Sequence, residues 1–345
     1  MNPEVSPAKA SGAVCSRRIW RRSGQLLLLI SPLLAVLVSL MAGSFTLSPG
    51  ELLTLLAAGP GDSVDQIILW QLRLPRALLA GLVGAALSLA GATFQATLRN
   101  PLADPYLLGV SGGAALGAVA ALTSGVAVTL LVPLAAFAGA LGTLLLVYLV
   151  ARAHTCSPHT LILSGVMIGS LAGALLLFLL WQAPVEAARQ AIFWMAGNLS
   201  LASPGALNWS WIWIGSGALL LWTRAAQLDL MTQGEETAAN LGIDVGRTRL
   251  LLFTIAGALT ASAVALAGMI GFVGLVIPHI CRLLWGPGHR RLLPCAALLG
   301  SSFLILADAI ARSVYAPAEI PVGVVTALLG APFFLYLLQR NRGAM

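Results

Sequence analysis

Long apolar runs alternate with short polar connections along almost the whole chain. Ten of these runs approach the length that an α-helix needs to cross the hydrocarbon core of a bilayer. The pattern therefore predicts an all-α polytopic membrane protein with about ten transmembrane helices. Arginines or prolines interrupt two of the runs, the second and the eighth. The predicted spans lie near residues 25–45, 72–97, 105–123, 127–150, 160–182, 207–223, 248–268, 271–285, 292–312 and 321–339.

The composition indicates a membrane protein without a separate soluble domain. Of the 345 residues, 59% are hydrophobic and only 9% are charged, and the mean hydropathy is +0.92. Soluble domains carry about 25% charged residues. We divide the chain into a basic tail, residues 1–23, and a single transmembrane domain, residues 24–345. The first apolar run is longer than the core of a signal peptide, so we interpret it as a retained span.

The distribution of positive charge sets the predicted orientation. With the N-terminus in the cytoplasm, fifteen of the 19 lysines and arginines fall in the tail or in cytoplasmic connections. Such a bias is typical of the cytoplasmic side of a membrane protein, and it places both termini in the cytoplasm. It also explains the net charge of +7 without nucleic-acid binding. The four arginines predicted to lie outside are Arg73, Arg76, Arg189 and Arg312.

Several kinds of chemistry are disfavoured. The single lysine, Lys9, lies in the tail, so no G-x-x-x-x-G-K-[ST] phosphate loop exists; an ATP-driven process would need a nucleotide site on another subunit. No His-Glu-x-x-His motif and no Cys-x-x-Cys pair occurs, and we predict no metal site.

Ion-coupled secondary transport of a bulky hydrophobic solute is the alternative to transport driven by ATP. That class usually has ionisable groups at mid-membrane, whereas here only Asp308 comes close to such a position.

The stretch GEETAANLG, residues 234–242, is polar between two apolar runs. We predict a short helix that begins after Gly234, carries Glu235 and Glu236 in its first turn, and ends at Gly242. Asp244 would then cap the next helix. A solvated loop is the plainer alternative, but the two bracketing glycines favour a rigid docking element on the cytoplasmic side, within about residues 229–247.

Four stretches together carry a family resemblance. They are LRLPRALLAGLVGAALSLAGATFQATLRNPLADPYLLGVSGGA, GEETAANLG, GMIGFVGLVIPHICR and LADAIARSVYAPAEIPVGVVTALLGAPFF. In order and spacing they resemble the FecCD-type permease subunits of type II ABC importers, which take up iron-siderophores, haem and vitamin B12. The resemblance covers about residues 25–340. It implies a bundle like that of the vitamin B12 permease, with inverted-repeat halves; an echo between residues 81–91 and 254–268 agrees with such a repeat.

The resemblance also implies an assembly. Two copies of the chain would form a homodimer that encloses the pathway between spans five and ten. Two ATP-binding subunits would bind from the cytoplasm, and a periplasmic substrate-binding protein would deliver the cargo. This chain would bind no cofactor and catalyse no reaction, because ATP and Mg would sit on the partner ATPase. Haem, a ferric siderophore and cobalamin remain as substrates, and we favour the iron compounds slightly.

Three groups of site residues follow from the resemblance. The glutamates of the first group either pair with ATPase cations or simply cap their helix, and we keep both interpretations. For His159 and His279 we favour structural roles over contact with substrate. The groups are ATPase coupling by Gly234, Glu235, Glu236, Ala238, Leu241 and Gly242; binding-protein docking by Arg73, Arg76 and Arg312; and a cytoplasmic gate at Ser157, Pro158 and His159.

Overall fold

The computed structural model describes residues 27–43, 45–124, 131–153, 157–200 and 204–340, and these residues form helices and connections without a strand. The predicted basic tail lies outside the described residues. The helices are Leu27–Met41, α2 (Pro49–Ala58), α3 (Val64–Ile67), η1 (Ile68–Arg73), α4 (Leu74–Thr97), η2 (Pro105–Leu108), α5 (Val110–Thr123), α6 (Leu131–Arg152), α7 (Pro158–Gln182), α8 (Val185–Met195), α9 (Pro204–Thr223), α10 (Ala225–Thr232), α11 (Glu235–Asn240), α12 (Val245–Ala267), α13 (Val273–Trp285), α14 (His289–Ser313) and α15 (Val322–Arg340).

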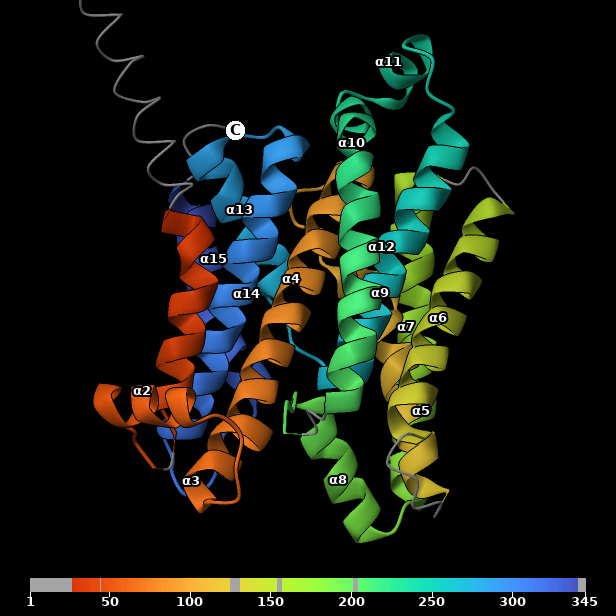
Figure 1. Cartoon of the computed structure of the whole chain (residues 1–345). Coiled ribbons are helices and arrows are strands. Elements are labelled where there is room, and N and C mark those ends of the chain that lie inside the picture. Colours follow the sequence, from red (N-terminus) through yellow and green to blue (C-terminus); the bar gives the residue numbers. More distant parts are fainter. Residues whose placement is uncertain (1–26, 44, 125–130, 154–156, 201–203, 341–345) are drawn as a thin grey trace, which may run out of the picture.

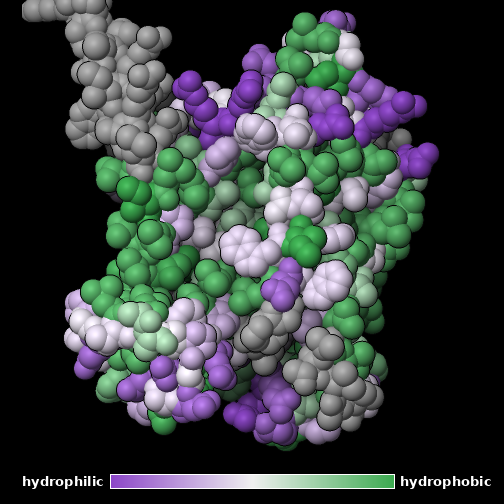
Figure 2. Space-filling model, viewed as in Figure 1, coloured by the Kyte–Doolittle hydropathy of each residue, from purple (hydrophilic) through white to green (hydrophobic). Residues whose placement is uncertain are grey.

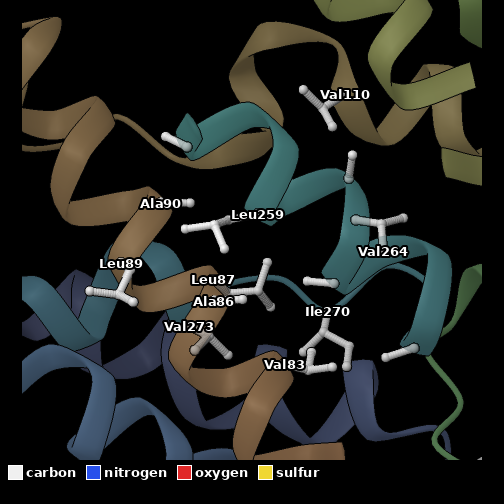
Figure 3. Close-up of a cluster of buried hydrophobic side chains, with 14 of the residues drawn as sticks. Val83, Ala86, Leu87, Leu89, Ala90, Val110, Leu259, Val264, Ile270 and Val273 are labelled. Atoms are coloured by element: carbon white, nitrogen blue, oxygen red, sulfur yellow. The ribbon is translucent and has the colours of Figure 1, made fainter. Parts of the chain in front are cut away.

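Helix α4 forms the axis of the bundle (Figure 1). Together with α3 and the wider π-type turn η1 it runs without a break from Val64 to Thr97, and 89% of its most apolar window is buried. It packs against α9, α12, α13 and α14. Figure 3 shows three of its side chains, Val83, Leu87 and Ala90, in one buried cluster with Leu259 and Val264 of α12 and Val273 of α13.

Small residues explain how α4 can have so many neighbours. A Cβ at Gly91 would overlap the backbone of Gly274 in α13, and a Cβ at Gly84 would overlap the carbonyl of Gly300 in α14. Larger side chains at these glycines would hold the helices apart. Without them the two backbones come into direct contact and gain dispersion energy. In a bilayer such close packing is a main source of helix association. The lipid tails are themselves apolar, so burying apolar side chains between helices gives no hydrophobic gain.

Two irregular segments of the chain contact each other. After α4 the chain runs through residues 98–109 before α5 begins, and after α12 it runs through residues 268–272 before α13 begins. The Tyr106 hydroxyl joins the two segments, since it accepts a hydrogen bond from the Ile270 backbone N–H (2.9 Å) and donates one to the Ile270 carbonyl (3.1 Å). The same plan, a long helix followed by a break and a short helix, therefore occurs in both halves of the chain.

Each predicted span overlaps a helix of the structure, with corrected boundaries. Within the described residues, five helices are long and apolar enough to cross a membrane, and α5, α13 and the N-terminal helix are among the shorter apolar ones. The second predicted span, residues 72–97, lies within a longer helix that begins at Val64. Helices α2 and α8 were not predicted as elements of their own. The start of α2 carries a sequence signal, since Ser48 and Glu51 form a capping box.

The bundle has two polar ends, which we call the α11 end and the α8 end (Figure 1). Figure 2 shows hydrophilic surface gathered at these ends, with a largely hydrophobic band between them. Arg99 and Arg249 both pair with Glu235 at the α11 end. Arg76 and Arg312 meet through Asp308 at the other end. These four arginines therefore lie at opposite ends of the bundle, which agrees with their predicted separation.

Candidate functional site

The predicted docking element is a helix closed at both ends. Gly234, with φ of +116°, precedes α11, and Glu235 and Glu236 lie in its first turn. The end is a Schellman motif: the N–H of Gly242 (φ +84°) donates to the Ala239 carbonyl, and the N–H of Ile243 donates to the Ala238 carbonyl. The sequence prediction of this helix and its glycine boundaries is confirmed. Asp244 also caps α12 as predicted, by accepting from the N–H of Arg247.

The two glutamates of α11 have different surroundings. The Glu235 carboxylate lies 2.6 Å from Nη2 of Arg249 in α12 and 3.8 Å from Nη2 of Arg99, which follows α4. Glu235 therefore ties the short helix to the ends of two long ones. Glu236 is exposed, as is Leu241 with 61% of its surface accessible. Ala238 is fully buried and seats the helix.

We expect Glu235→Ala to loosen α11 and Glu236→Ala to leave it in place. The first change leaves the buried guanidinium of Arg249 without that carboxylate, whereas the second removes an exposed charge. Limited proteolysis within residues 232–244 should accelerate about fivefold or more for the Glu235 variant alone. Equal acceleration in both variants would show that Glu235 does not hold the helix.

The three arginines assigned to docking meet at the α8 end, but two of them are buried. Arg73 donates to the carbonyl of Leu40 (2.6 Å) and to that of Phe45, and Arg312 donates to Oγ of Ser39 (2.7 Å). Both side chains thus close the turn after the N-terminal helix. Arg73 is 7% exposed and Arg312 is 5% exposed. In this structure they have a structural role that was not predicted from the sequence.

Arg76 is held between two carboxylates. Its Nη2 lies 2.9 Å from Asp308, which is fully buried and also binds Nε of Arg312 at 3.0 Å. Its Nη1 lies 2.8 Å from Glu319, whose side chain is 42% exposed. Arg76 and Glu319 border a cavity of about 170 Å³ between the loop after α8 and the start of α15. The spacing of Asp308 and Arg312, one helical turn apart, was the available signal for this network.

Arg189 has no part in that network. It lies on α8 and pairs with Glu186 one turn earlier at 2.8 Å, with both side chains more than 60% exposed. The hydrogen bonds from Arg189 and Gln190 lower the pKa of Glu186. The pair covers a helix surface and indicates no site.

The predicted gate residues form the start of α7. Ser157 is its N-cap and accepts from the N–H of Thr160, buried Pro158 occupies the first turn, and His159 is exposed. Proline is well suited to the first turn, where its missing N–H has no helical partner. Residues 154–156, just before, lie outside the described part. The structure thus gives these residues a capping role, and gating stays a prediction.

The predicted pathway helices each have an uncovered apolar face. Only 28% of the most apolar window of α7 is buried, and Met167 and Leu171 are more than 60% exposed. On α15, Leu328 is 68% exposed. A groove of about 430 Å³ runs beside α15, lined by Met195, Ala196, Met269, Gly323, Val324, Ala327 and Leu328.

Two further patterns hold no catalytic or metal site. Residues 109–113 spell G-x-S-x-G, but this string follows the 3₁₀ turn η2 rather than a strand, so it lacks the strand–turn–helix context of a hydrolase. His279 and Cys281 lie on α13, with Cys281 buried. Among the described residues no three His, Cys, Asp or Glu side chains could hold a metal ion together.

The family model of the FecCD transport family matches residues 28–340, nearly the entire chain. The chain belongs to the FecCD transport family. The family resemblance found in the sequence is thereby confirmed, and with it the all-helical permease fold.

Individual members of the FecCD family are similar along most of their length. The uncharacterised ABC transporter permease protein YvrB of Bacillus subtilis is 43% identical, over 83% of this chain and 82% of that protein. The vitamin B12 import system permease protein BtuC of Escherichia coli is 42% identical, over 90% and 93%. A solved inward-facing conformation of a metal-chelate type ABC transporter covers 91% of this chain and 98% of that one, with 33% identity and a TM-score of 0.83.

These relatives establish the class of this FecCD-family member. It is the membrane permease subunit of an ABC importer of the FecCD/BtuC type, and a multi-pass membrane protein. Such a subunit agrees with a chain whose single lysine excludes a phosphate loop. The similarity to these relatives assigns no role to individual residues, so the coupling, docking and gate residues remain predictions.

Proposed function

We propose that two copies of this chain form the membrane part of an ATP-driven importer, and that α11 is the element through which a separate ATPase drives it. The observation that carries the proposal is the geometry of α11 in a FecCD-family chain. A six-residue helix projects from the α11 end with Leu241 and Glu236 exposed, while Glu235 anchors it to α4 and α12. A helix that is anchored to the bundle can transmit a displacement from a partner subunit to the transmembrane helices, whereas a flexible loop would not transmit it.

The pathway would lie between the uncovered faces of α7 and α15 in the two copies. A second copy provides apolar surface for these faces that the single chain does not. The groove beside α15 is apolar and includes Met195 and Met269. Methionine side chains adapt to irregular partners, so such walls suit a bulky cargo that must pass without being held tightly.

The substrate we propose is a metal-bearing macrocycle or chelate. The similarity to a vitamin B12 permease and to a metal-chelate type transporter supports this class. Cobalamin becomes the first compound to test, ahead of haem and ferric siderophores, which the sequence analysis favoured slightly. The cargo would arrive on a periplasmic binding protein across the inner membrane.

For docking of that binding protein we now assign Arg76 alone. Its side chain is more exposed than that of Arg312, 13% against 6%, and its partner Glu319 is at the surface. An acidic side chain of the binding protein could take the place of Glu319. Arg73 and Arg312 would support this position from inside without touching the partner.

Uptake by the reconstituted complex tests the proposal. The chain is co-expressed with its cognate ATPase, reconstituted in proteoliposomes, and supplied with the binding protein and ATP. We expect accumulation of cobalamin, haem or a ferric siderophore, and loss of uptake when Leu241→Asp places a charge on the exposed apolar contact of α11. An ATPase that binds while none of the three is taken up would reject the substrate class, and a chain that binds no ATPase would reject the importer.

The ion-coupled alternative depends on a free acidic group within the membrane. Asp308 is the candidate, and it is bound by two arginines. Both of its carboxylate oxygens bind guanidinium nitrogens, so Asp308 is not a free acidic group. We therefore retain the ATP-driven importer as the function.

A further inference from the structure

The region that leads into α11 is pinned to a transmembrane helix by a side chain outside α11. Asp229 lies on α10, and its Oδ1 accepts a hydrogen bond of 2.8 Å from the backbone N–H of His289, the first residue of α14. The same oxygen lies 2.7 Å from Nδ1 of His289. The His289 side chain is 4% exposed, whereas that of Asp229 is 43% exposed. The exposed carboxylate of Asp229 therefore binds the buried first residue of α14.

This carboxylate replaces a cap that α14 lacks locally. The N-cap position of α14 is Gly288, which makes no side-chain cap hydrogen bond. The first N–H groups of a helix have no partner within the helix, and the helix dipole favours a negative charge beside them. Most caps come from the residue just before the helix, as Asp244 does for α12. Asp229 comes from 60 residues away and so joins two elements.

Helix α14 extends this link to the opposite end of the bundle. Its last turns hold Asp308, which binds Arg76 of α4, and Arg312, which binds Ser39. A helix of this length, His289–Ser313, spans about 37 Å at 1.5 Å per residue. Rigid helices with fixed contacts at both ends can carry coupling between distant sites. The chain thus has a continuous line of contacts from α10 to the docking position at Arg76.

We propose that Asp229 is a positioning residue for transport: it locks the α10–α11 unit to the start of α14, so that displacement of α11 moves α14 with it. This inference rests on the proposed role of α11 as the ATPase contact. Without Asp229, α11 would still bind the ATPase through its own surface and its own anchor at Glu235. The motion of α11 would then reach α14 only in part, and ATP would be hydrolysed with little transport.

The first measurement is hydrogen exchange of the purified chain in nanodiscs. Asp229→Ala should speed exchange in the first turn of α14, residues 289–292, about fivefold or more, because the cap on the His289 N–H is gone. Asp244→Ala is the matched control, since it also removes an aspartate cap but only from α12. Unchanged exchange at residues 289–292 in the Asp229 variant would overturn the link.

The second measurement is the number of ATP molecules hydrolysed per cobalamin molecule taken up by the reconstituted importer. We expect Asp229→Ala to raise this ratio about fivefold or more, with ATPase co-purification within about twofold of wild type. Asp229→Asn should restore most of the coupling, because its amide oxygen still accepts from the His289 N–H. A normal ratio in the alanine variant would overturn the inference and leave the importer intact. Failure of the wild-type chain to bind any ATPase would overturn the proposed function itself, a result that the exchange data do not depend on.

Discussion

Replacing Asp308 by alanine should cost this protein about 3–5 kcal/mol of stability, enough to lose most of the folded material. Asp308 is fully buried and binds Nη2 of Arg76 at 2.9 Å and Nε of Arg312 at 3.0 Å. Removing it leaves the buried guanidinium of Arg312 without a counter-charge. The midpoint of thermal unfolding in detergent should fall by at least about 5 °C, and the yield of monodisperse protein should drop with it.

Glu319→Gln is the matched control for that experiment. Glu319 binds Arg76 at 2.8 Å, but the Glu319 side chain is 42% exposed. Exposed ion pairs contribute less than about 1 kcal/mol to stability. A third variant tests the cause: in Asp308→Leu combined with Arg312→Met, both buried charges are gone. Part of the lost stability should return, since apolar side chains of similar size can replace a buried ion pair. If the double variant were no more stable than Asp308→Leu alone, unpaired charge would not be the cause.

The sequence predicted the membrane-spanning plan because apolar run length is a local property. Each predicted span overlaps a helix, and the glycine-bracketed helix α11 appears with the predicted caps. What the sequence did not predict depends on tertiary contact. The break at residues 98–109 is stabilised by Tyr106 bonding to Ile270, a residue 164 positions away. A hydropathy pattern contains no information about a hydrogen bond between distant residues, so residues 105–123 were predicted as one uninterrupted span.

Side-chain direction is a further property that the sequence did not show. Arg73 and Arg312 were assigned to docking from the family resemblance, and their docking role stays a prediction, but a sequence pattern places arginines at span ends without showing which way they point. In the structure they point inward and bind carbonyls and Ser39. Asp229 and His289 were not singled out, because their contact joins α10 to α14 across 60 residues. Capping within a few residues can be predicted from sequence, but capping by a distant side chain cannot.

The glycines of α6 offer a second large effect with an internal control three residues away. A Cβ at Gly139 would overlap the carbonyl oxygen of Gly113 in α5, whereas a Cβ at Gly142 would meet no atom within 4 Å. Both positions are in the interior of the same helix. We expect Gly139→Ala to destabilise the protein by about 1–3 kcal/mol or more, since backbone rather than a flexible side chain must move. Gly142→Ala should be neutral or stabilise by up to about 1 kcal/mol, from the better helix propensity of alanine.

The comparison of these two variants separates helix propensity from helix contact. Thermal unfolding in detergent gives the stability of each, and disulfide crosslinking between cysteines introduced on α5 and α6 reports whether the helices stay together. Because α5 and α6 share a longer contact than most pairs in the bundle, a loss at Gly139 should appear as separation of this pair before the rest unfolds. Equal destabilisation by both alanines would mean that α6 needs flexible backbone rather than close approach. Close approach through small residues would then not be what stabilises the contact of α5 with α6, nor that of α4 with α13 at Gly91 and Gly274.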